Sequence, residues 1–379
     1  MHFLAAAILT LATAANALKI PSFAPPDFPV SDIDNDGTHA GRYDVRKTMV
    51  WLDDKNPENL NSYFYLFWLT TVDGRKYHTT LAPNFFRGRT TGIFRVEDLQ
   101  DLSSTGATVF APGTGSSEYL NLRSEIQNLT SPRGGDNYTA MHVTSDYAGV
   151  KLDVHMTPTG KNLYIGGNGG VTLSSPGNDF RELVPGYSWY WVCAGSDFKW
   201  CLANRDQGNP TLRLSGTINI DGKDVEIDHG KSRGYFERQS GEFGISGGHW
   251  GYWLYLSNGI FIHGWVVGAT VERPYSTPAW ATVWHPNGIH EVLEVGNTTT
   301  ATDVWKSPVS GKNYFQNFKL DLPSREASFH IHQAIKKSEL RPLPGSDGYQ
   351  ITEAYSQGHG VWEGEKVTFY GHTEQLSYW

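Results

Sequence analysis

The chain has 379 residues, a formal net charge of −8 and only 18% charged residues. Its length suits two domains better than one, and its acidic balance provides no basic field for nucleic acid or an anionic membrane surface. We therefore expect small lipophilic partners and no nucleic acid. No membrane span is expected either, because no segment approaches the length of apolar chain that crosses a bilayer.

The first 17 residues have the pattern of a signal peptide. An apolar run from Phe3 to Ala15 precedes an Ala15-Asn16-Ala17 cleavage pattern, and the run is too short to cross a bilayer. We expect residues 1–17 to be removed and the mature chain, from Leu18, to lie in the secretory lumen or outside the cell. Residues 18–41 are rich in proline and aspartate and should form an extended lead-in.

Three sequons and two cysteines agree with that location. Asn128, Asn137 and Asn297 each begin an Asn-x-Thr glycosylation sequon. Cys193 and Cys201 are the only cysteines and flank seven residues, which suits a disulfide across a hairpin in an oxidising compartment. Two buried free thiols are the alternative.

From residue 42 onward the pattern is one of short strands separated by turns, with almost no helical periodicity. The turn dipeptides Asp221-Gly222 and Asn258-Gly259 are typical of tight hairpins. We expect an all-β fold of two packed antiparallel barrels, residues 42–210 and 211–379, divided at the polar segment 204–210. The expected strands include 62–72, 187–193, 212–220, 250–256, 259–271, 279–284, 327–334 and 366–370.

Several familiar catalytic patterns are missing from the sequence. It has no Gly-x-Ser-x-Gly elbow, phosphate loop or dinucleotide fingerprint, so we expect neither a serine hydrolase nor a nucleotide enzyme, and no cofactor. His330 and His332 would face one side of a strand, where His359 or Glu363 could complete a metal site. Ordinary polar residues of a sheet explain the pair better, and we predict no metal.

The cluster Glu237-Arg238-Gln239 is more specific. In a strand, Glu237 and Gln239 point to one face and Arg238 to the other, so that the first two could share a cavity while the arginine fixes the structure behind it. Burial raises the pKa of a carboxyl group, which suits a general acid. A salt bridge at the end of a barrel, with no chemical role, explains the cluster equally well.

The chain has 13 tryptophans, more than a hydrophobic core requires. An indole offers a flat apolar wall and one N–H donor, so several around a cavity would hold a polycyclic or terpenoid ligand. Core packing is expected for most, with three or four at a pocket. Trp284 is followed directly by His285, which places a donor or base beside an indole.

Several segments together resemble the hydroxyneurosporene synthase, kievitone hydratase and AttH-like superfamily. They are SGTINIDGKDVEID, GYFERQSG and GYWLYLSNG, the closing segments SPVSGKNYFQNFKLDLP and VWEGEKVTFYGH, and the hairpin at 62–77. The resemblance covers most of the mature chain and implies two lipocalin-like barrels that meet at a cleft. The superfamily includes hydratases and fungal Diels-Alderases, and this chain looks most like the hetero-Diels-Alderases that join a tropolone quinone methide to humulene.

Two positions depart from the superfamily pattern. The acid is usually aspartate, where this chain has Glu237, and the tryptophan that follows is replaced by Ser240. A hydratase depends on a well-placed acid, whereas a pericyclase needs a shaped apolar cavity and a few hydrogen-bond donors. We therefore favour a cofactor-free pericyclase of fungal secondary metabolism that catalyses an intermolecular hetero-Diels-Alder reaction between a tropolone quinone methide and a sesquiterpene such as humulene.

This hypothesis assigns roles to eight residues. Glu237 or His285 would be the acid that eliminates water to form the quinone methide, and Tyr190 and His249 would donate hydrogen bonds to the developing oxyanion. The substrate-binding residues would be Trp253, Trp284, Trp362 and Gln239. A hydratase or dehydratase acting on a prenylated aromatic or terpenoid compound is the alternative, and a non-catalytic carrier of lipophiles is a third hypothesis.

Overall fold

The computed structural model describes residues 20–23, 49, 60–86, 89–134, 138, 140–160, 163–164, 172–174, 179–181, 205–241, 249–267, 269, 271, 275, 279–287, 290–345 and 350–376. Several predictions fall elsewhere. The signal peptide at 1–17, the strand at 187–193, and Tyr190, Cys193, Cys201 and Asn137 lie outside the described residues. Of the lead-in at 18–41, only 20–23 are described.

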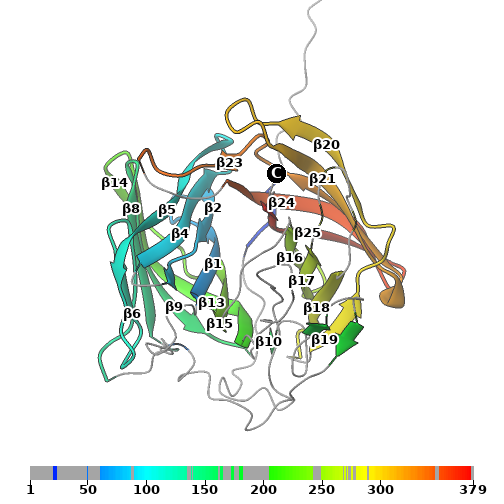
Figure 1. Cartoon of the computed structure of the whole chain (residues 1–379), viewed down its shortest axis with the longest axis horizontal. Helices are drawn as coiled ribbons and strands as arrows, with labels where there is room; N and C mark the ends of the chain where they lie inside the picture. Colours follow the sequence, from blue (N-terminus) through cyan, green and yellow to red (C-terminus); the bar gives the residue numbers. More distant parts are fainter. Residues whose placement is uncertain are drawn as a thin grey trace, which may run out of the picture.

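The described part is almost entirely β-structure and contains two large sheets, as Figure 1 shows. The strands of the first are β1 (Leu60–Thr70), β2 (Lys76–Leu81), β3 (Asn84–Phe86), β4 (Arg89–Asp98), β5 (Ser103–Thr114), β6 (Asn121–Ser124), β7 (Gln127–Thr130), β8 (Met141–Tyr147), β9 (Val150–Pro158), β10 (Leu163–Tyr164), β13 (Arg205–Ile220), β14 (Lys223–Glu226) and β15 (Arg233–Gly241). Antiparallel pairing of β13 with both β15 and β9 closes ten of these strands into a barrel.

The second sheet is a curled half-barrel. Its strands are β16 (His249–Leu256), β17 (Phe261–Val267), β18 (Ala279–Trp284), β19 (His290–Glu294), β20 (Thr300–Lys306), β21 (Asn313–Leu322), β22 (Ala327–Gln333), β23 (Glu339–Leu340), β24 (Ile351–Trp362) and β25 (Glu365–Leu376). A short 3₁₀ turn, η1 (Pro323–Arg325), joins β21 to β22, and a separate small pair consists of β11 (Thr172–Ser174) and β12 (Asp179–Arg181). The predicted all-β fold of two packed barrel domains is confirmed.

The boundary expected at residue 210 does not separate the two sheets. It falls inside β13, and β14 and β15 also belong to the first sheet, so that the chain passes to the second sheet between Gly241 and His249. The sequence misplaced the change because both sheets consist of short strands separated by turns. The hairpin signal at Asp221-Gly222 was correct: both residues have positive φ, 53° and 81°, as the tight turn between β13 and β14 requires.

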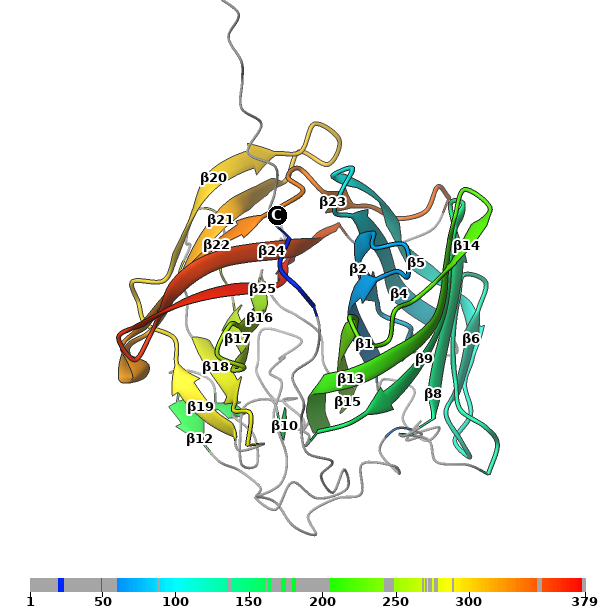
Figure 2. The ribbon, with the colours of Figure 1, turned by 180° about the vertical axis from the view of Figure 1, so that it is seen from behind.

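Three apolar clusters hold the fold together. One fills the first barrel and includes Tyr65, Val143 and Leu214; another fills the concave side of the second sheet and includes Tyr252, Leu254 and Phe329. The remaining cluster lies between the sheets and contains residues of both. Figure 2 shows the two sheets side by side from behind, with the segment Ile20–Phe23 running between them.

The strand β16 contributes side chains to two of these clusters. All eight of its residues are buried, because the strand packs on both faces. Tyr252 and Leu254 point into the second sheet, whereas Trp253 and Tyr255 point toward the first barrel. This is why HWGYWLYL reads as a continuous apolar run rather than an alternating one.

Candidate functional site between the two sheets

Glu237 lies in the layer between the sheets, on the face of β15 that points away from the interior of the first barrel. Glu237 is 3% exposed, and its carboxyl group accepts a hydrogen bond of 2.8 Å from the Tyr235 hydroxyl. Burial raises its pKa to about 8, since the nearby Glu374 adds to the effect of burial and the donors Tyr235 and Trp253 only partly offset it. Glu237 is therefore mostly a neutral acid at pH 7.

Arg238 points to the opposite face, as the strand period predicts. Its Nη2 donates to Asn61 Oδ1 at 2.6 Å and its guanidinium lies 4.3 Å from the centre of the Tyr63 ring. The arginine is thus bound within the first barrel and does not neutralise Glu237. The backbone of Gln239 pairs with Ser62, and its side chain lies outside the described part of the structure.

Aromatic rings surround the Glu237 carboxyl group. The Trp253 indole stacks on the His263 imidazole at 4.8 Å and on the Phe64 ring at 5.3 Å, and Tyr235 stacks on Phe261 at 5.1 Å. The position of Trp253 depends on a glycine two residues earlier. A Cβ atom on Gly251 would lie 2.5 Å from Cζ3 of this indole, so only glycine leaves room for the ring.

His263 is close to Glu237 but does not share its proton. Its Nε2 lies 3.7 Å from Glu237 Oε2 and accepts a hydrogen bond from the Trp265 indole N–H. An indole nitrogen only donates, so Nε2 is unprotonated and the neutral ring carries its proton on Nδ1. Burial lowers the pKa of His263 well below its usual value, in agreement with a neutral imidazole.

A second acidic group lies on the hairpin of β24 and β25. His372 Nε2 is 2.6 Å from Glu353 Oε2, and His249 Nε2 is hydrogen-bonded to Glu374 Oε1. Burial, and then the neighbouring Glu374, raise the pKa of Glu353 well above its usual value. Burial lowers the pKa of His372 well below its usual value. Both members of the Glu353–His372 pair are therefore neutral.

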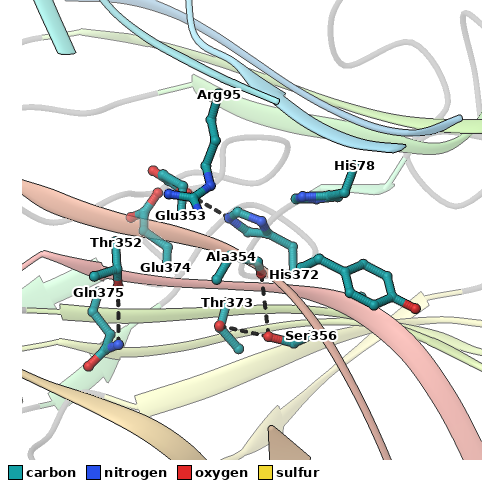
Figure 3. A network of polar contacts seen from close by, with 12 residues as sticks. His78, Arg95, Thr352, Glu353, Ala354, Ser356, His372, Thr373, Glu374 and Gln375 are labelled. Atoms are coloured by element: carbon teal, nitrogen blue, oxygen red, sulfur yellow. Dashed lines mark hydrogen bonds and ion pairs between the residues drawn. The ribbon is translucent and has the colours of Figure 1, made fainter. Parts of the chain in front are cut away.

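Two residues of β4 connect this group to the first barrel. Arg95 donates to Glu97 Oε1 at 2.9 Å and to the Ser338 carbonyl oxygen at 2.8 Å, and Glu97 Oε2 accepts the Tyr355 N–H at 2.6 Å. Burial opposes ionisation of Glu97, yet Arg95 and His78 outweigh it and its pKa is lowered. Figure 3 shows Arg95 and His78 reaching from the first sheet toward Glu353, Glu374 and His372.

The structure brings together some of the predicted site residues. Glu237, Trp253 and Trp284 belong to the layer between the sheets or border it, and His249 is buried beside Trp265 and Glu374. Trp362 instead packs in the interior cluster of the second sheet, 6.2 Å from the His285 ring. His285 is half-exposed, and its Nε2 lies 3.0 Å from Glu291 Oε1.

Sequence reasoning missed Arg95, Glu97, Glu353, His372 and Glu374. A signal was present, because Arg95 and Glu97, and likewise His372 and Glu374, occupy alternate positions of the strands β4 and β25. Such spacing places both ionisable groups on one buried face. The expected strand at 366–370 stopped before His372, so this second pair was not recognised.

Two groups of histidines bear on metal binding. His330 and His359 pair across β22 and β24, with their rings 5.5 Å apart, whereas Glu363 is bound to Arg325. On the first barrel, possible ligand atoms of His142, Asp153 and His155 lie within 4.8 Å of one another, and all three side chains are at least partly exposed. None of the contacts described above joins either histidine group to Glu237.

A groove of about 830 Å³ opens at one end of the layer between the sheets. The residues that line it include Pro21 and Ser22, Arg233 at the start of β15, and Tyr255 and Tyr370, which lie on the face of the second sheet toward the first barrel. Lys76 holds the N-terminal segment at its edge by donating to the carbonyl oxygens of Ile20 and Pro21. The groove adjoins the aromatic cluster that contains Glu237's neighbours Tyr235 and Trp253.

No family model matches the chain, and no curated protein matches it by sequence. Solved structures do match. Kievitone hydratase from Nectria haematococca superposes with a TM-score of 0.73 at 15% identity, over 94% of this chain and 98% of the hydratase. An AttH-like protein from Nitrosomonas europaea gives a TM-score of 0.63 at 14% identity, over 84% of this chain and 93% of that one.

A third structure, CghA with Sch210972, gives a TM-score of 0.49 at 11% identity, over 94% of this chain and 97% of that one. The first two matches show that the chain has the two-sheet fold of kievitone hydratase and the AttH-like protein. The resemblance seen in the sequence is thereby confirmed at the level of the fold. Among the described residues, no helix is long and apolar enough to cross a membrane.

Proposed function

We propose that this chain is an enzyme that adds water to, or removes it from, a small lipophilic aromatic or terpenoid compound, with Glu237 as the proton donor. The observation that carries the proposal is the buried Glu237 carboxyl group, whose pKa of about 8 keeps it protonated at neutral pH. A general acid is most effective when its pKa lies near the working pH. This carboxyl group also lies between two domains, where small-molecule sites are common.

In a dehydration, Glu237 would protonate the leaving hydroxyl group, and the carbon next to the resulting cation would return a proton to the carboxylate as the alkene forms. In a hydration, Glu237 would protonate an alkene carbon, water would attack the cation that forms, and the added water would return its extra proton to the carboxylate. In either direction the acid becomes a carboxylate in the transition state. The Tyr235 hydroxyl, already 2.8 Å from Glu237 Oε2, would stabilise that charge without reorganisation. The Trp253 N–H has no hydrogen-bond partner among the described residues, and by turning toward the carboxylate it would add to this effect.

The aromatic walls suit the other charge of this reaction. Protonation of a prenyl alkene puts positive charge on carbon, and the faces of Trp253, Tyr235 and Phe261 attract a cation. Buried histidines also offer polar atoms to a bound water or hydroxyl group. The Nδ1 atoms of His249, His263 and His372 have no hydrogen-bond partner in the described part of the chain.

Substrate would reach Glu237 from the groove at Arg233 only if aromatic side chains between them move. Tyr255 lines the groove and packs on Phe261, which in turn stacks on Tyr235 beside Glu237. Ring rotations of this kind are ordinary side-chain motions. The similarity in fold to kievitone hydratase supports the proposal.

Labelled water tests the proposed reaction directly. A prenylated phenol incubated with the protein in H₂¹⁸O should give a hydrated product that carries ¹⁸O, and Glu237→Gln should slow its formation by about 10²–10⁴-fold. Product with no ¹⁸O, formed at an undiminished rate by Glu237→Gln, would rule the proposal out. Tight binding of the compound with no turnover would instead favour a lipophile carrier.

The hetero-Diels-Alder reaction remains a second candidate, favoured by the aromatic side chains around Glu237. Here Glu237 would eliminate water from a hydroxymethyl tropolone, and the quinone methide would react with a sesquiterpene such as humulene held against the indoles. The cycloadduct would contain no oxygen from solvent. The same ¹⁸O experiment therefore separates a hydration from the cycloaddition.

We also propose that the mature enzyme acts in the secretory pathway or outside the cell. The pattern at residues 1–17, the sequons and the cysteine pair support this location. Secreted protein should begin near Leu18 and lose two thiol hydrogens in a disulfide between Cys193 and Cys201, both measurable by intact mass. An N-terminus at Met1 or two free thiols in secreted material would contradict these expectations.

A further inference from the structure

The groove beside Arg233 combines positive charge with aromatic surface. Arg233 is 4% exposed, and its guanidinium lies 4.4 Å from the centre of the Tyr255 ring. The Tyr370 hydroxyl also interacts with this guanidinium, and Tyr255 and Tyr370 stack on each other at 5.4 Å. These contacts hold the arginine in one place, so little side-chain entropy would be lost when it binds a ligand.

Among the described residues that line the groove, Arg233 is the one with a permanent charge, and that charge is positive. The residues known to line it include Arg233, His332 and His359 but no aspartate or glutamate. A second hollow of about 600 Å³ shares Ser257, His359 and Thr368 with it and adds His330 and Lys366, again with no carboxylate among the described lining residues. The whole chain has a net charge of −8, so this surface departs from the average of the molecule.

We propose that this groove binds the anionic oxygens of a lipophilic acid, such as an aryl carboxylate or an acidic enol. A guanidinium matches the geometry of two conjugated oxygens, which it binds with paired hydrogen bonds. The aromatic rings of Tyr255, Tyr370 and Phe369 would contact the body of the ligand. A neutral ligand of the same shape would gain the contacts with the aromatic rings but not the paired hydrogen bonds of an anion to the guanidinium.

The position of Arg233 relates this anion site to the proposed acid. Arg233, Tyr235 and Glu237 alternate along β15 and so lie on one face. At about 3.3 Å per residue, Arg233 and Glu237 are about 13 Å apart along the strand. The inference rests on the proposed function in one respect: a substrate anchored at Arg233 by its acidic group would present its far, unsaturated end to Glu237.

Equilibrium binding of two matched probes tests this site. Isothermal titration should show that 1-naphthoate binds the full-length mature protein at least about tenfold more tightly than neutral 1-naphthamide. Arg233→Gln should remove this preference. Arg123→Gln, which neutralises an exposed arginine of β6, should retain it, because the net charge changes equally in both variants.

Further variants keep the outcome clear. If Arg233→Gln does not fold by circular dichroism, Arg233→Lys, which keeps the charge but loses the paired hydrogen bonds of the guanidinium, should reduce the preference for naphthoate. Equal binding of the two probes by the wild-type protein, or an undiminished preference in Arg233→Gln or in Arg233→Lys, would overturn the proposal. Glu237→Gln should still prefer naphthoate, so that a wrong assignment of the catalytic acid leaves this result unaffected.

Discussion

Two buried glutamates in the layer between the sheets, Glu97 and Glu237, have opposite protonation. Glu97 lies 2.9 Å from Arg95 and accepts the Tyr355 N–H, and its pKa is lowered despite complete burial. The described donor to Glu237, the Tyr235 hydroxyl, is neutral, and the pKa of Glu237 is raised to about 8. A buried carboxyl group thus ionises where a cation compensates for its lost hydration and remains an acid where none does. Glu97 links the two sheets, and Glu237 is available as a proton donor.

The largest expected effect is on catalysis. Glu237→Gln keeps the shape and the neutral charge of the protonated side chain but removes the transferable proton, so kcat should fall by about 10²–10⁴-fold. Steady-state turnover of a prenylated phenol measures this change. Glu226→Gln, the same substitution at an exposed position of β14, is the matched control and should keep full activity. Equal rates for both variants would contradict the assignment of Glu237.

The next effect is on stability, and it should appear at Glu97 but not at Glu353. Glu97→Gln leaves Arg95 buried without its carboxylate, which should cost about 3–5 kcal/mol in the free energy of unfolding. Glu353 is already neutral, because burial raises its pKa, so Glu353→Gln should cost less than about 1 kcal/mol. Urea unfolding of the two variants at pH 7 makes the comparison, and equal losses would show that both glutamates have the same charge.

The pH dependence should separate the two kinds of glutamate as well. The pKa of Glu237 is raised in the folded state, so its contribution to stability is fully present below the unfolded pKa, about 4.5, and is lost as pH rises to about 8. Between about pH 5 and pH 8, the free energy of unfolding should therefore fall less in Glu237→Gln than in the wild type. Activity that depends on the acid should fall in the wild type as pH rises through about 8.

A smaller effect concerns the aromatic wall. Gly251→Ala places a methyl group where the Trp253 ring lies, so the indole must move away from His263 and Glu237. We expect kcat/KM to fall by about tenfold, or about 1.4 kcal/mol, with a shift in tryptophan fluorescence. An unchanged spectrum together with full activity would show that the position of this indole is not important. Gly222→Ala is not a suitable control, although Gly222 lies in an exposed turn, because its positive φ would strain an alanine.

The smallest effect is expected at the sequons. Asn297 is exposed in the turn before β20, whereas the Asn128 side chain lies in β7 and donates to Thr144 Oγ1 at 3.2 Å. Asn297→Gln should therefore remove one glycan from the secreted protein. Asn128→Gln should lower the mass of the secreted protein by less than Asn297→Gln does, because the Asn128 side chain is held within the sheet. Neither substitution should change activity. Mass spectrometry of material from a eukaryotic host measures both, and glycan at Asn128 alone would contradict this order.

Much of the fold could be predicted because strand signals are local. The alternation along β15 correctly placed Glu237 and Arg238 on opposite faces, and the Asp221-Gly222 turn was found from two residues. The boundary at 210 failed because nothing local distinguishes β13 from a strand of the second sheet. His285 and Trp362 were grouped with Glu237 from residue type alone, but Trp362 packs in the interior cluster of the second sheet, and His285 contacts Trp362 and Glu291.

By itself, the sequence determined the all-β class, several of the strands, and the proximity of an acid to indoles. Only the tertiary structure decided the charge of each buried acid. The pKa of Glu97 depends in part on the backbone of Tyr355, 258 residues further along the chain, and that of Glu237 depends on Glu374 and on burial by a second sheet. Strand formation follows from neighbours in sequence, but ionisation in a protein interior follows from the charges and the hydration that remain after the sheets have packed.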